Sequence, residues 1–262
     1  MDTHYPTDLT DGQWKILAKL LPAPARRGRP PLCRRWVINA ILYLNRTGCQ
    51  WRLLPSDFPN WKSVYTIFRR WRESGLWQQL HETLCKQVRK QAGKKPTPSV
   101  AILDSQSIRT AEGGEERGYD AGKQITGRKR HIAVDTLGLI WAVVVHGAYW
   151  QDQVGAWFVL QRLPGLKRLR VLFADSAYGR NDLPTLVKET FGWLLQTILR
   201  PVGIKGFVVL PKRWIVERTF AWLARCRRHS KDYERNTDSS ECMIYVSMTA
   251  LMLKRLDNKN LL

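Results

Sequence analysis

The sequence of 262 residues lacks an apolar run long enough to span a bilayer, and it lacks a signal peptide. It also lacks a C-x-x-C pair. Its five cysteines are widely spaced, at Cys33, Cys49, Cys85, Cys226 and Cys242. This spacing indicates reduced thiols and does not predict a disulfide framework. We therefore expect a soluble protein that works inside the cell.

Acidic residues are scarce relative to basic ones. The chain carries 43 Lys and Arg against 22 Asp and Glu, a formal charge of +21, and the excess is spread along its length. Such an imbalance favours a polyanionic partner, and nucleic acid is the leading candidate. A membrane surface or ribosomal RNA would also suit the charge. The 12 tryptophans and several candidate catalytic acids, however, are unusual for a small ribosomal protein.

Several common catalytic motifs are missing. No G-x-S-x-G motif surrounds Ser105, and the Gly-Lys pair at 122–123 lacks the rest of a phosphate-binding loop. His81 and Cys85 stand one helical turn apart, but the sequence offers them no partner pair for zinc. These absences argue against a serine hydrolase, a P-loop enzyme and a zinc protein.

Two apolar runs of strand length each end on an aspartate. Residues 100–103 precede Asp104, and residues 171–174 precede Asp175. In an α/β sheet, strands of this kind present an acid at their carboxyl edge. A third acid, Glu217, lies in a segment with helical spacing that runs from Arg213 to Arg228. If these three acids meet, they form a cage for metal ions.

The segment from Arg213 sorts into two faces at 100° per residue. The apolar face, which we expect to pack on the sheet, consists of Ile215, Val216, Phe220, Trp222 and Leu223. Glu217 falls on the other face. It is either a catalytic acid or a surface acid paired with Arg213 or Arg218. The two aspartates at strand ends favour the catalytic interpretation.

Three carboxylates within a few ångströms repel one another unless cations neutralise them. A pair of Mg²⁺ ions about 4 Å apart would do so, and would activate a water or a 3′-hydroxyl for attack on a phosphodiester. Ligand sets made only of oxygen favour Mg²⁺ or Mn²⁺ over zinc. Asp135 and Asp152 are rival acids, but a hairpin turn explains the first and a helix start explains the second.

The pattern of the sequence changes along the chain. Residues 1–92 hold several short amphipathic helices, residues 93–99 form a Lys- and Pro-rich linker, and residues 100–262 alternate strands with helices. The order strand, hairpin, helix, strand, helix, strand, helix predicts a ribonuclease H-like α/β domain. We therefore expect a small all-α helix-turn-helix-like domain before a mixed sheet flanked by helices. The polar stretch 110–127 receives no role.

The basic residues indicate where nucleic acid would bind. The segment 26–31 is either an arm that enters a minor groove or a basic linker. The helices of residues 1–92 are either a DNA reader or a helical bundle with a basic surface. The predicted nucleic-acid-binding residues are Arg27, Arg29, Arg69, Arg70, Arg128, Lys129, Arg130, Arg213, Arg218, Arg225, Arg228 and Lys231.

Longer stretches carry a family resemblance. They are RTGCQWRLLP at 46–55, DSQS at 104–107, GRKRH at 127–131, FAD at 173–175, and GFVVLP at 206–211 running into RWIVERTFAW at 213–222. Over nearly its whole length the chain resembles bacterial insertion-sequence transposases of the DDE type, of the "insertion sequence 5" family. A related signature, Y-x2-R-x3-E-x6-K, is half present. Arg213 and Glu217 fit it, whereas Leu210 and Ala224 stand at its Tyr and Lys positions.

The resemblance implies that Asp104, Asp175 and Glu217 are the DDE triad and hold Mg²⁺. It implies an enzyme that binds the terminal inverted repeats, cleaves the donor strand and transfers the freed 3′-hydroxyl to target DNA. Such an enzyme would form a homo-oligomer in the synaptic complex and would work on the nucleoid in the bacterial cytoplasm. The alternatives are a Mg²⁺ nuclease of the same fold without strand transfer, and a DNA-binding regulator with an inert catalytic domain.

Overall fold

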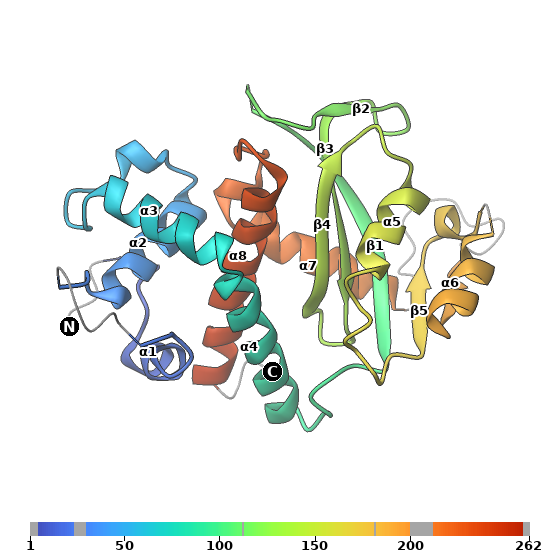
Figure 1. Ribbon diagram of the computed structural model, residues 1–262, viewed down its shortest axis with the longest axis horizontal. Coiled ribbons are helices and arrows are strands. Elements are labelled where there is room, and N and C mark those ends of the chain that lie inside the picture. The colour runs from blue at the N-terminus through green and yellow to red at the C-terminus, as the bar shows by residue number, and fades with distance from the viewer. Residues whose placement is uncertain (1–4, 24–29, 112, 181, 200–211, 259–262) are drawn as a thin grey trace. The chain divides into compact units, whose positions relative to one another are not determined.

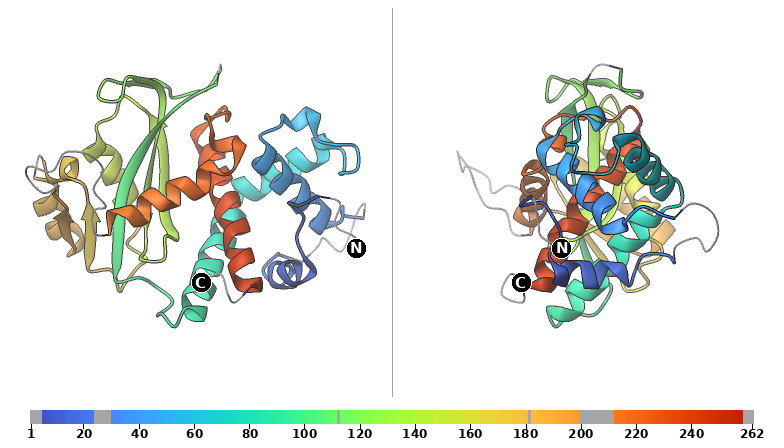
Figure 2. Two further views of the ribbon diagram at one scale, coloured as in Figure 1. Left: turned by 180° about the vertical axis from the view of Figure 1, so that it is seen from behind. Right: turned by 90° about the vertical axis from the view of Figure 1, so that its left-hand side faces the viewer.

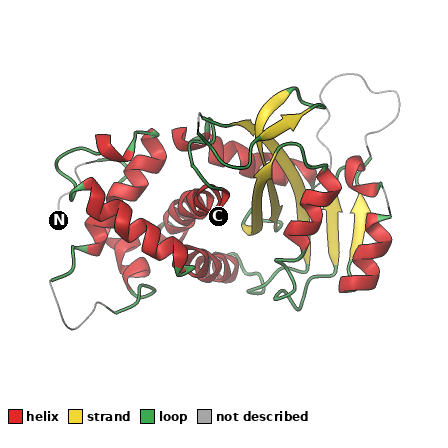
Figure 3. Cartoon of the chain, turned by 45° about the horizontal axis from the view of Figure 1, so that its top comes forward, coloured by secondary structure: helices red, strands yellow, loops and turns green. Residues whose placement is uncertain are grey.

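The structure is a computed structural model, and it describes residues 5–23, 30–111, 113–180, 182–199 and 212–258. The chain divides into two compact units. The first unit comprises residues 1–93, 225–230 and 242–262, and the second comprises residues 94–224 and 231–241. All the described strands belong to the second unit (Figure 3). The predicted boundaries of 1–92, 93–99 and 100–262 stay a prediction about separate domains.

The first unit is helical. Its helices are α1 (Asp11–Ala18), α2 (Arg34–Thr47), α3 (Trp61–Glu73), α4 (Leu76–Gln91) and most of α8 (Thr237–Asp257), with short 3-10 turns at Trp51–Leu53 and Arg227–His229. The predicted capping box is confirmed, because the Thr10 hydroxyl accepts from the Gln13 amide at 3.1 Å and the Gln13 side chain reaches back. Gly48 ends α2 with φ +74°, as a left-handed C-cap requires.

Helix α8 completes the core of this unit, although no element was predicted for these residues. It lies beside α4 (Figure 1), where the Cys85 thiol contacts the Met252 sulfur at 3.5 Å and the Gln91 amide donates to the Arg255 carbonyl. His81 of α4 is 3% exposed, and burial lowers its pKa to about 3. Burial therefore keeps this imidazole neutral within the core of the first unit.

The second unit contains a six-stranded mixed sheet. Its strands are β1 (Val100–Arg109), β2 (Gly118–Asp120), β3 (Ile125–Val134), β4 (Ile140–Gly147), β5 (Val171–Ala174) and β6 (Leu194–Thr197). They are ordered β2-β3-β1-β5-β6, with β4 on β3; β1, β3 and β4 pair antiparallel, and β1, β5 and β6 pair parallel. The predicted hairpin is β3–β4, and the short strand β2 was not predicted.

Helices cover both faces of this sheet. Helices α5 (Asp152–Leu160) and α6 (Leu183–Phe191) share one apolar core with the sheet, whereas α7 (Arg213–Ala224) lies against the opposite face (Figures 1 and 2). This arrangement confirms the predicted fold class of a mixed sheet flanked by helices after a helical N-terminal region. Within the described ranges, no helix combines the length and the apolar character that crossing a membrane demands.

A buried arginine ties the stretch 110–117 to the end of the unit. The Arg128 side chain is fully buried and forms an ion pair of 3.2 Å with Asp232. Its guanidinium also donates to the backbone carbonyls of Glu115, Glu234 and Arg235. Arg128 thus joins the backbone at Glu115 to the segment 232–235. This part of the stretch 110–127, to which the sequence assigned no role, therefore has a structural role.

Candidate active site

The pairing of β1 with β5 brings two of the predicted acids together. The strands are parallel, and Ile102 lies opposite Phe173. Asp104 and Asp175 each follow these partners by two residues, so the register places them side by side. Asp175 follows the last residue of β5, whereas Asp104 lies inside β1, which continues to Arg109. The predicted strand end at Asp175 is confirmed and the one at Asp104 is wrong, because β1 continues pairing with β3 beyond it. Only the register makes the two acids neighbours.

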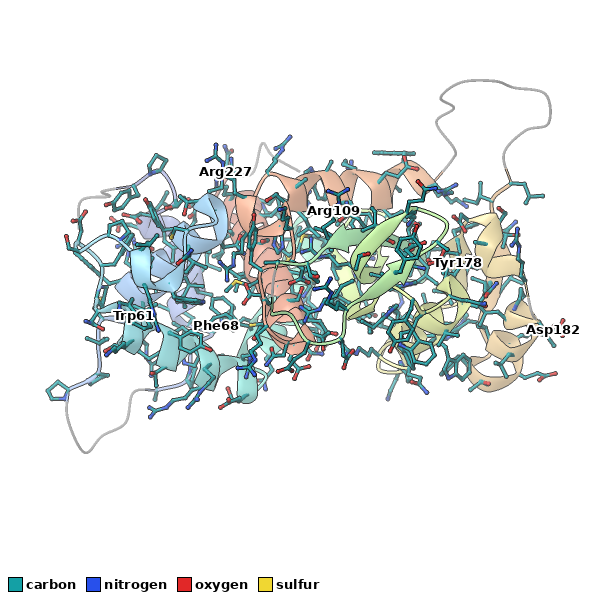
Figure 4. All side chains as sticks on the ribbon, turned by 90° about the horizontal axis from the view of Figure 1, so that it is seen from above. Trp61, Phe68, Arg109, Tyr178, Asp182 and Arg227 are labelled. Atoms are coloured by element: carbon teal, nitrogen blue, oxygen red, sulfur yellow. The ribbon has the colours of Figure 1, made fainter. Side chains whose placement is uncertain are left out.

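Asp175 is held by the turn that follows it. Its carboxylate accepts a hydrogen bond of 2.8 Å from the Ala177 amide and so caps the 3-10 turn Ser176–Gly179. The side chain of Tyr178 from this turn, labelled in Figure 4, is buried. Burial and the charges of Asp104 and Asp152 raise the pKa of Tyr178 well above its usual range, so the phenol stays neutral.

Glu217 reaches the same region from α7. The side chain is 48% exposed, on the face of α7 opposite its buried residues, which are Ile215, Val216, Thr219, Phe220 and Leu223. Trp222, predicted to pack on the sheet, is only half-buried, and the guanidinium of Arg218 lies 4.6 Å from the centre of its ring. The helix ends at Ala224, four residues before the predicted end.

One guanidinium links two of the acids. Arg213 Nη2 lies 3.9 Å from Asp175 Oδ2 and 3.8 Å from Glu217 Oε1. Its charge also acts on Asp104, where it lowers the pKa. Arg213, which the sequence pattern had assigned to nucleic acid, thus pairs with Asp175 and Glu217, and its charge also acts on Asp104.

Asp104 has an unusual pKa. Burial raises it from 3.8 to about 6, and the charge of Asp175 adds to the effect. The Ser105 amide, which donates to Asp104 at 2.8 Å, and the charges of Arg213 and Lys123 act in the opposite direction. In the protein alone, the neighbouring positive charge and hydrogen bonds do not fully offset the cost of burying the ionised carboxylate of Asp104. An added cation would therefore stabilise this carboxylate strongly.

This shift predicts that Asp104→Asn stabilises the protein in the absence of divalent ions. An acid whose pKa is raised by folding contributes stability below pH 4, and this contribution is lost as the pH rises through about 6. At pH 8 the variant should therefore be more stable than the parent by roughly 1–3 kcal/mol. At pH 4 the two should unfold alike. Thermal or urea unfolding in EDTA at both pH values checks this, and an equal difference at both would contradict it.

Two lysines near the acids were not predicted. Lys123 is exposed in the turn between β2 and β3, and its charge acts on Asp104. The carboxylate of Asp120 holds this turn by accepting from the Gly122 and Lys123 amides. Lys212 precedes α7 with φ +68°, and its ammonium lies 3.6 Å from the centre of the Phe173 ring. Neither lysine stands in a recognisable motif, so neither could be selected from the sequence.

The donors at this site suit a divalent cation, because all three are carboxylates. In the part of the chain that the structure describes, no three His, Cys, Asp or Glu side chains are grouped closely enough to hold a metal ion. The guanidinium of Arg213 instead supplies the positive charge between Asp175 and Glu217. The residues fit a hard cation in chemistry, and closing around one requires this guanidinium to move aside.

The other predicted nucleic-acid-binding residues differ in their exposure. Arg27 and Arg29, like Leu210 of the signature, lie outside the described residues. The exposed residues are Arg69, Arg70, Arg225 and Lys231. Arg218 is partly covered by two tryptophan rings.

Four of the predicted residues are buried. They are Arg128, Lys129, Arg130 and Arg228, with exposed fractions of 0%, 6%, 1% and 8%. Lys129 forms ion pairs with Asp152 at 3.1 Å and Asp120 at 3.5 Å, and Arg228 donates to the Cys49 carbonyl. A buried cation with internal partners cannot reach a phosphate without breaking them. A structural role therefore replaces the DNA-binding role predicted for these four.

Two family models match this chain. Residues 95–253 match the family described as "Transposase DDE domain", and residues 9–81 match the family described as "Putative transposase of IS4/5 family". The first match spans more than half of the chain and contains all three acids.

Three similar proteins come from insertion sequences or their bacterial hosts. The "Insertion element IS402 uncharacterized 16.2 kDa protein" of Burkholderia cepacia is 35% identical over 118 residues, which is 42% of this chain and 78% of that protein. The "Uncharacterized protein y4sN" of Sinorhizobium fredii is 28% identical over 30% of this chain and 65% of that protein. The "Putative transposase for insertion sequence element IS402" of Burkholderia cepacia is 28% identical over 43% of this chain and 56% of that protein. The last two matches thus span less than two thirds of the relatives' own length.

Proposed function

This chain belongs to the DDE transposases of the insertion sequence 4 and 5 group, and we propose that it cuts the ends of its element and joins them to target DNA. In this proposal it binds the terminal inverted repeats, hydrolyses one strand at each end and transfers the freed 3′-hydroxyl into the target. The observation that carries the proposal is that Arg213 pairs with both Asp175 and Glu217, while the register of β1 and β5 places Asp104 next to Asp175.

We assign the catalytic and metal-binding role to Asp104, Asp175 and Glu217. Bound Mg²⁺, or Mn²⁺ in its place, would supply the activation of the attacking oxygen and the stabilisation of the leaving oxygen. Asp104 must lose its proton to serve as a ligand, so its raised pKa makes ion binding release a proton near pH 6. Asp175 is already fixed by the amide of Ala177, so it needs little reordering.

The cations at the site would hold the phosphates of the DNA. Arg213, once displaced from Asp175 and Glu217, carries a planar fork of donors that suits a phosphate. Lys123 and Lys212 are exposed beside the acids and can take the part of the lysine for which Ala224 stands in the family signature. Arg218, Arg225 and Lys231 remain candidates for contacts farther along the DNA.

The first unit would bind the element ends through α3. Only Val64 and Phe68 of this helix are buried, whereas Arg69 and Arg70 are exposed. Trp61, at the start of the helix, and Phe68 are labelled in Figure 4. The exposed Lys62 lies 5.8 Å from the centre of the Trp61 ring. A helix with a small buried stripe and a basic outer face suits insertion into a major groove. We accordingly propose the first unit, which includes residues 1–92 and most of α8, as the DNA-binding unit and the second unit, which holds Asp104, Asp175 and Glu217, as the catalytic unit.

Removing charge from this helix should weaken DNA binding without changing the chemistry. Replacing Arg69 and Arg70 together by Gln should lower the affinity for the element end and reduce the slope of log K against log salt by about one for each phosphate that is no longer neutralised. The control is Lys86→Gln on α4, where Lys86 pairs with Glu82 at 2.7 Å. A salt slope identical to that of the parent would remove α3 from the DNA interface. Fluorescence anisotropy at several salt concentrations measures it.

The test of the function itself is a strand-transfer assay. Labelled DNA carrying the inverted repeats that flank the element is mixed with the protein, a target plasmid and Mg²⁺, Mn²⁺ or EDTA. Cleavage at the ends and joined products that depend on the metal are expected. Cleavage without joining would favour the plain nuclease, and binding without cleavage would favour a regulator. We place this activity on the nucleoid of a bacterial cell, in a homo-oligomer that holds two ends together.

A further inference from the structure

The turn between β3 and β4 meets α7 beside Glu217. The turn begins at Asp135, which is fully buried and whose carboxylate accepts hydrogen bonds from the Leu137 and Leu139 amides at 2.8 and 3.1 Å. The same carboxylate accepts from the indole of Trp141 at 3.1 Å. A short turn fixed by three hydrogen bonds to one buried carboxylate is a rigid element.

Thr219 of α7 bonds directly to this turn. Its hydroxyl lies 3.0 Å from the Gly138 carbonyl oxygen and 3.0 Å from the Ile215 carbonyl oxygen, so its single proton is shared between the turn and the helix. Gly138 has φ +78°, and a Cβ added there would lie 2.7 Å from the Trp222 ring and 2.9 Å from the Thr219 hydroxyl. Only glycine allows the helix to approach the turn this closely.

A stacked stripe on α7 makes the second contact. Arg218 lies between the rings of Trp214 and Trp222, at 4.6 Å from each ring centre, and its guanidinium reaches the Leu137 carbonyl at 3.4 Å. Residues four apart lie on one face of a helix, so the three side chains form a continuous ladder. Because the Trp222 ring packs against Arg218 and Gly138, it does not belong to the apolar stripe of α7 that faces the sheet.

We propose that this contact, the α7 clamp (Asp135, Gly138, Arg218, Thr219 and Trp222), is a positioning device for Glu217. Glu217 immediately precedes the two anchored residues Arg218 and Thr219. An apolar stripe alone lets a helix rotate or slide on a sheet, and a rotation of about 20° would move a carboxylate at the helix surface by about 2 Å. Misplacement by about 1 Å can cost a catalytic site a hundredfold in rate. The clamp fixes the rotation of α7 and thereby the distance of Glu217 from Asp104 and Asp175.

The inference rests on the proposed function, and its test includes a measurement that needs no DNA. Thr219→Val keeps the shape of the side chain but removes the hydroxyl, whereas Thr219→Ser keeps the hydroxyl and serves as the matched control. Mn²⁺ binding to the free protein is measured by calorimetry, together with the Mg²⁺ dependence of end cleavage, the affinity for the element end and the melting temperature.

Thr219→Val should weaken Mn²⁺ binding about threefold to tenfold, raise the Mg²⁺ concentration for half-maximal cleavage by a similar factor, and reduce the maximal rate by about 10- to 100-fold. End binding should stay within twofold, and Thr219→Ser should restore all values to within about threefold of the parent. Unchanged Mn²⁺ affinity and Mg²⁺ dependence in Thr219→Val would overturn the proposal, whatever the melting temperature. If that variant does not fold, Trp222→Leu takes its place under the same criterion.

The outcomes separate this proposal from the function on which it rests. A parent protein that takes up Mn²⁺ but cuts no DNA contradicts the proposed function, while the Mn²⁺ titration still decides the role of the clamp. A parent that takes up no Mn²⁺ overturns both.

Discussion

Asp175→Asn should lower end cleavage and strand transfer by about three orders of magnitude or more, because in the proposed mechanism Asp175 is a metal ligand and a neutral amide cannot replace its carboxylate. The substitution keeps the local structure. The acceptor oxygen of Asn can still bond to the Ala177 amide, which the carboxylate now holds at 2.8 Å. The loss should therefore appear in the chemistry and in metal binding, with affinity for the element end within about threefold of the parent.

The control for this variant is Asp182→Asn. Asp182 is an exposed acid seven residues further along, its side chain caps no helix, and its backbone has φ +55°, a conformation that asparagine tolerates well (Figure 4). Single-turnover cleavage of labelled element ends, with a gel-shift assay on the same DNA, compares the two. Full cleavage by Asp175→Asn would remove this residue from the proposed triad.

Arg128→Met should destabilise the protein by about 3–5 kcal/mol, because it leaves Asp232 buried without its cation. The side chains of Arg128 and Asp232 are 0% and 1% exposed and lie 3.2 Å apart. The substitution also strips hydrogen bonds from the carbonyls of Glu115, Glu234 and Arg235. A loss of this size is a large share of the stability of an ordinary domain, so much of the variant should be unfolded or aggregated at 37 °C.

Urea unfolding measures this effect, with Arg109→Met as the control. Arg109 is exposed at the end of β1 and should change the free energy of unfolding by no more than about 0.5 kcal/mol. If Arg128 mainly contacted DNA, as the sequence suggested, its replacement would weaken DNA binding and leave the unfolding curve unchanged. A structural role for Arg128 thus predicts a large loss of stability, whereas a DNA-binding role predicts weaker DNA binding with unchanged stability.

The free site and the loaded site must differ in the position of one side chain. Arg213 neutralises Asp175 and Glu217 in the protein alone, at 3.9 and 3.8 Å. A guanidinium cannot occupy the same space as a divalent ion between these acids. In the proposed mechanism Arg213 would turn toward the phosphates when Asp175 and Glu217 hold a metal ion, which would give this residue one partner before DNA arrives and another afterwards.

Local patterns predicted much of the fold. The strand that ends before Asp175, the hairpin at 135–138 and the capping box at Thr10 all depend on neighbours within a few residues, and the structure contains each of them. The apolar run before Asp104 begins β1, but this strand continues to Arg109 because β3 pairs with it along that length. Helix α8 was missed because it is nearly buried along its length. A helix covered on most sides lacks the alternation of apolar and polar residues by which an amphipathic helix is found.

The buried arginines show the limit of composition as a guide. The run Arg128-Lys129-Arg130 has the character of a DNA-binding patch when only the charge is considered, yet all three side chains lie inside the second unit. Their partners, including Asp232 and Asp152, are distant in the sequence. No local pattern reports whether a positive charge will find an internal acid or remain in water.

The sequence by itself determined most of the strands and helices and the three acids that they carry, because strand and helix propensities, turns and caps are properties of adjacent residues. Only the tertiary structure decided that β1 and β5 pair in the register that joins Asp104 to Asp175, that Arg213 lies between Asp175 and Glu217, and that Thr219 bonds to Gly138. These contacts connect residues far apart in the chain. They are set by the packing of the whole sheet and its helices, which no short stretch of sequence encodes.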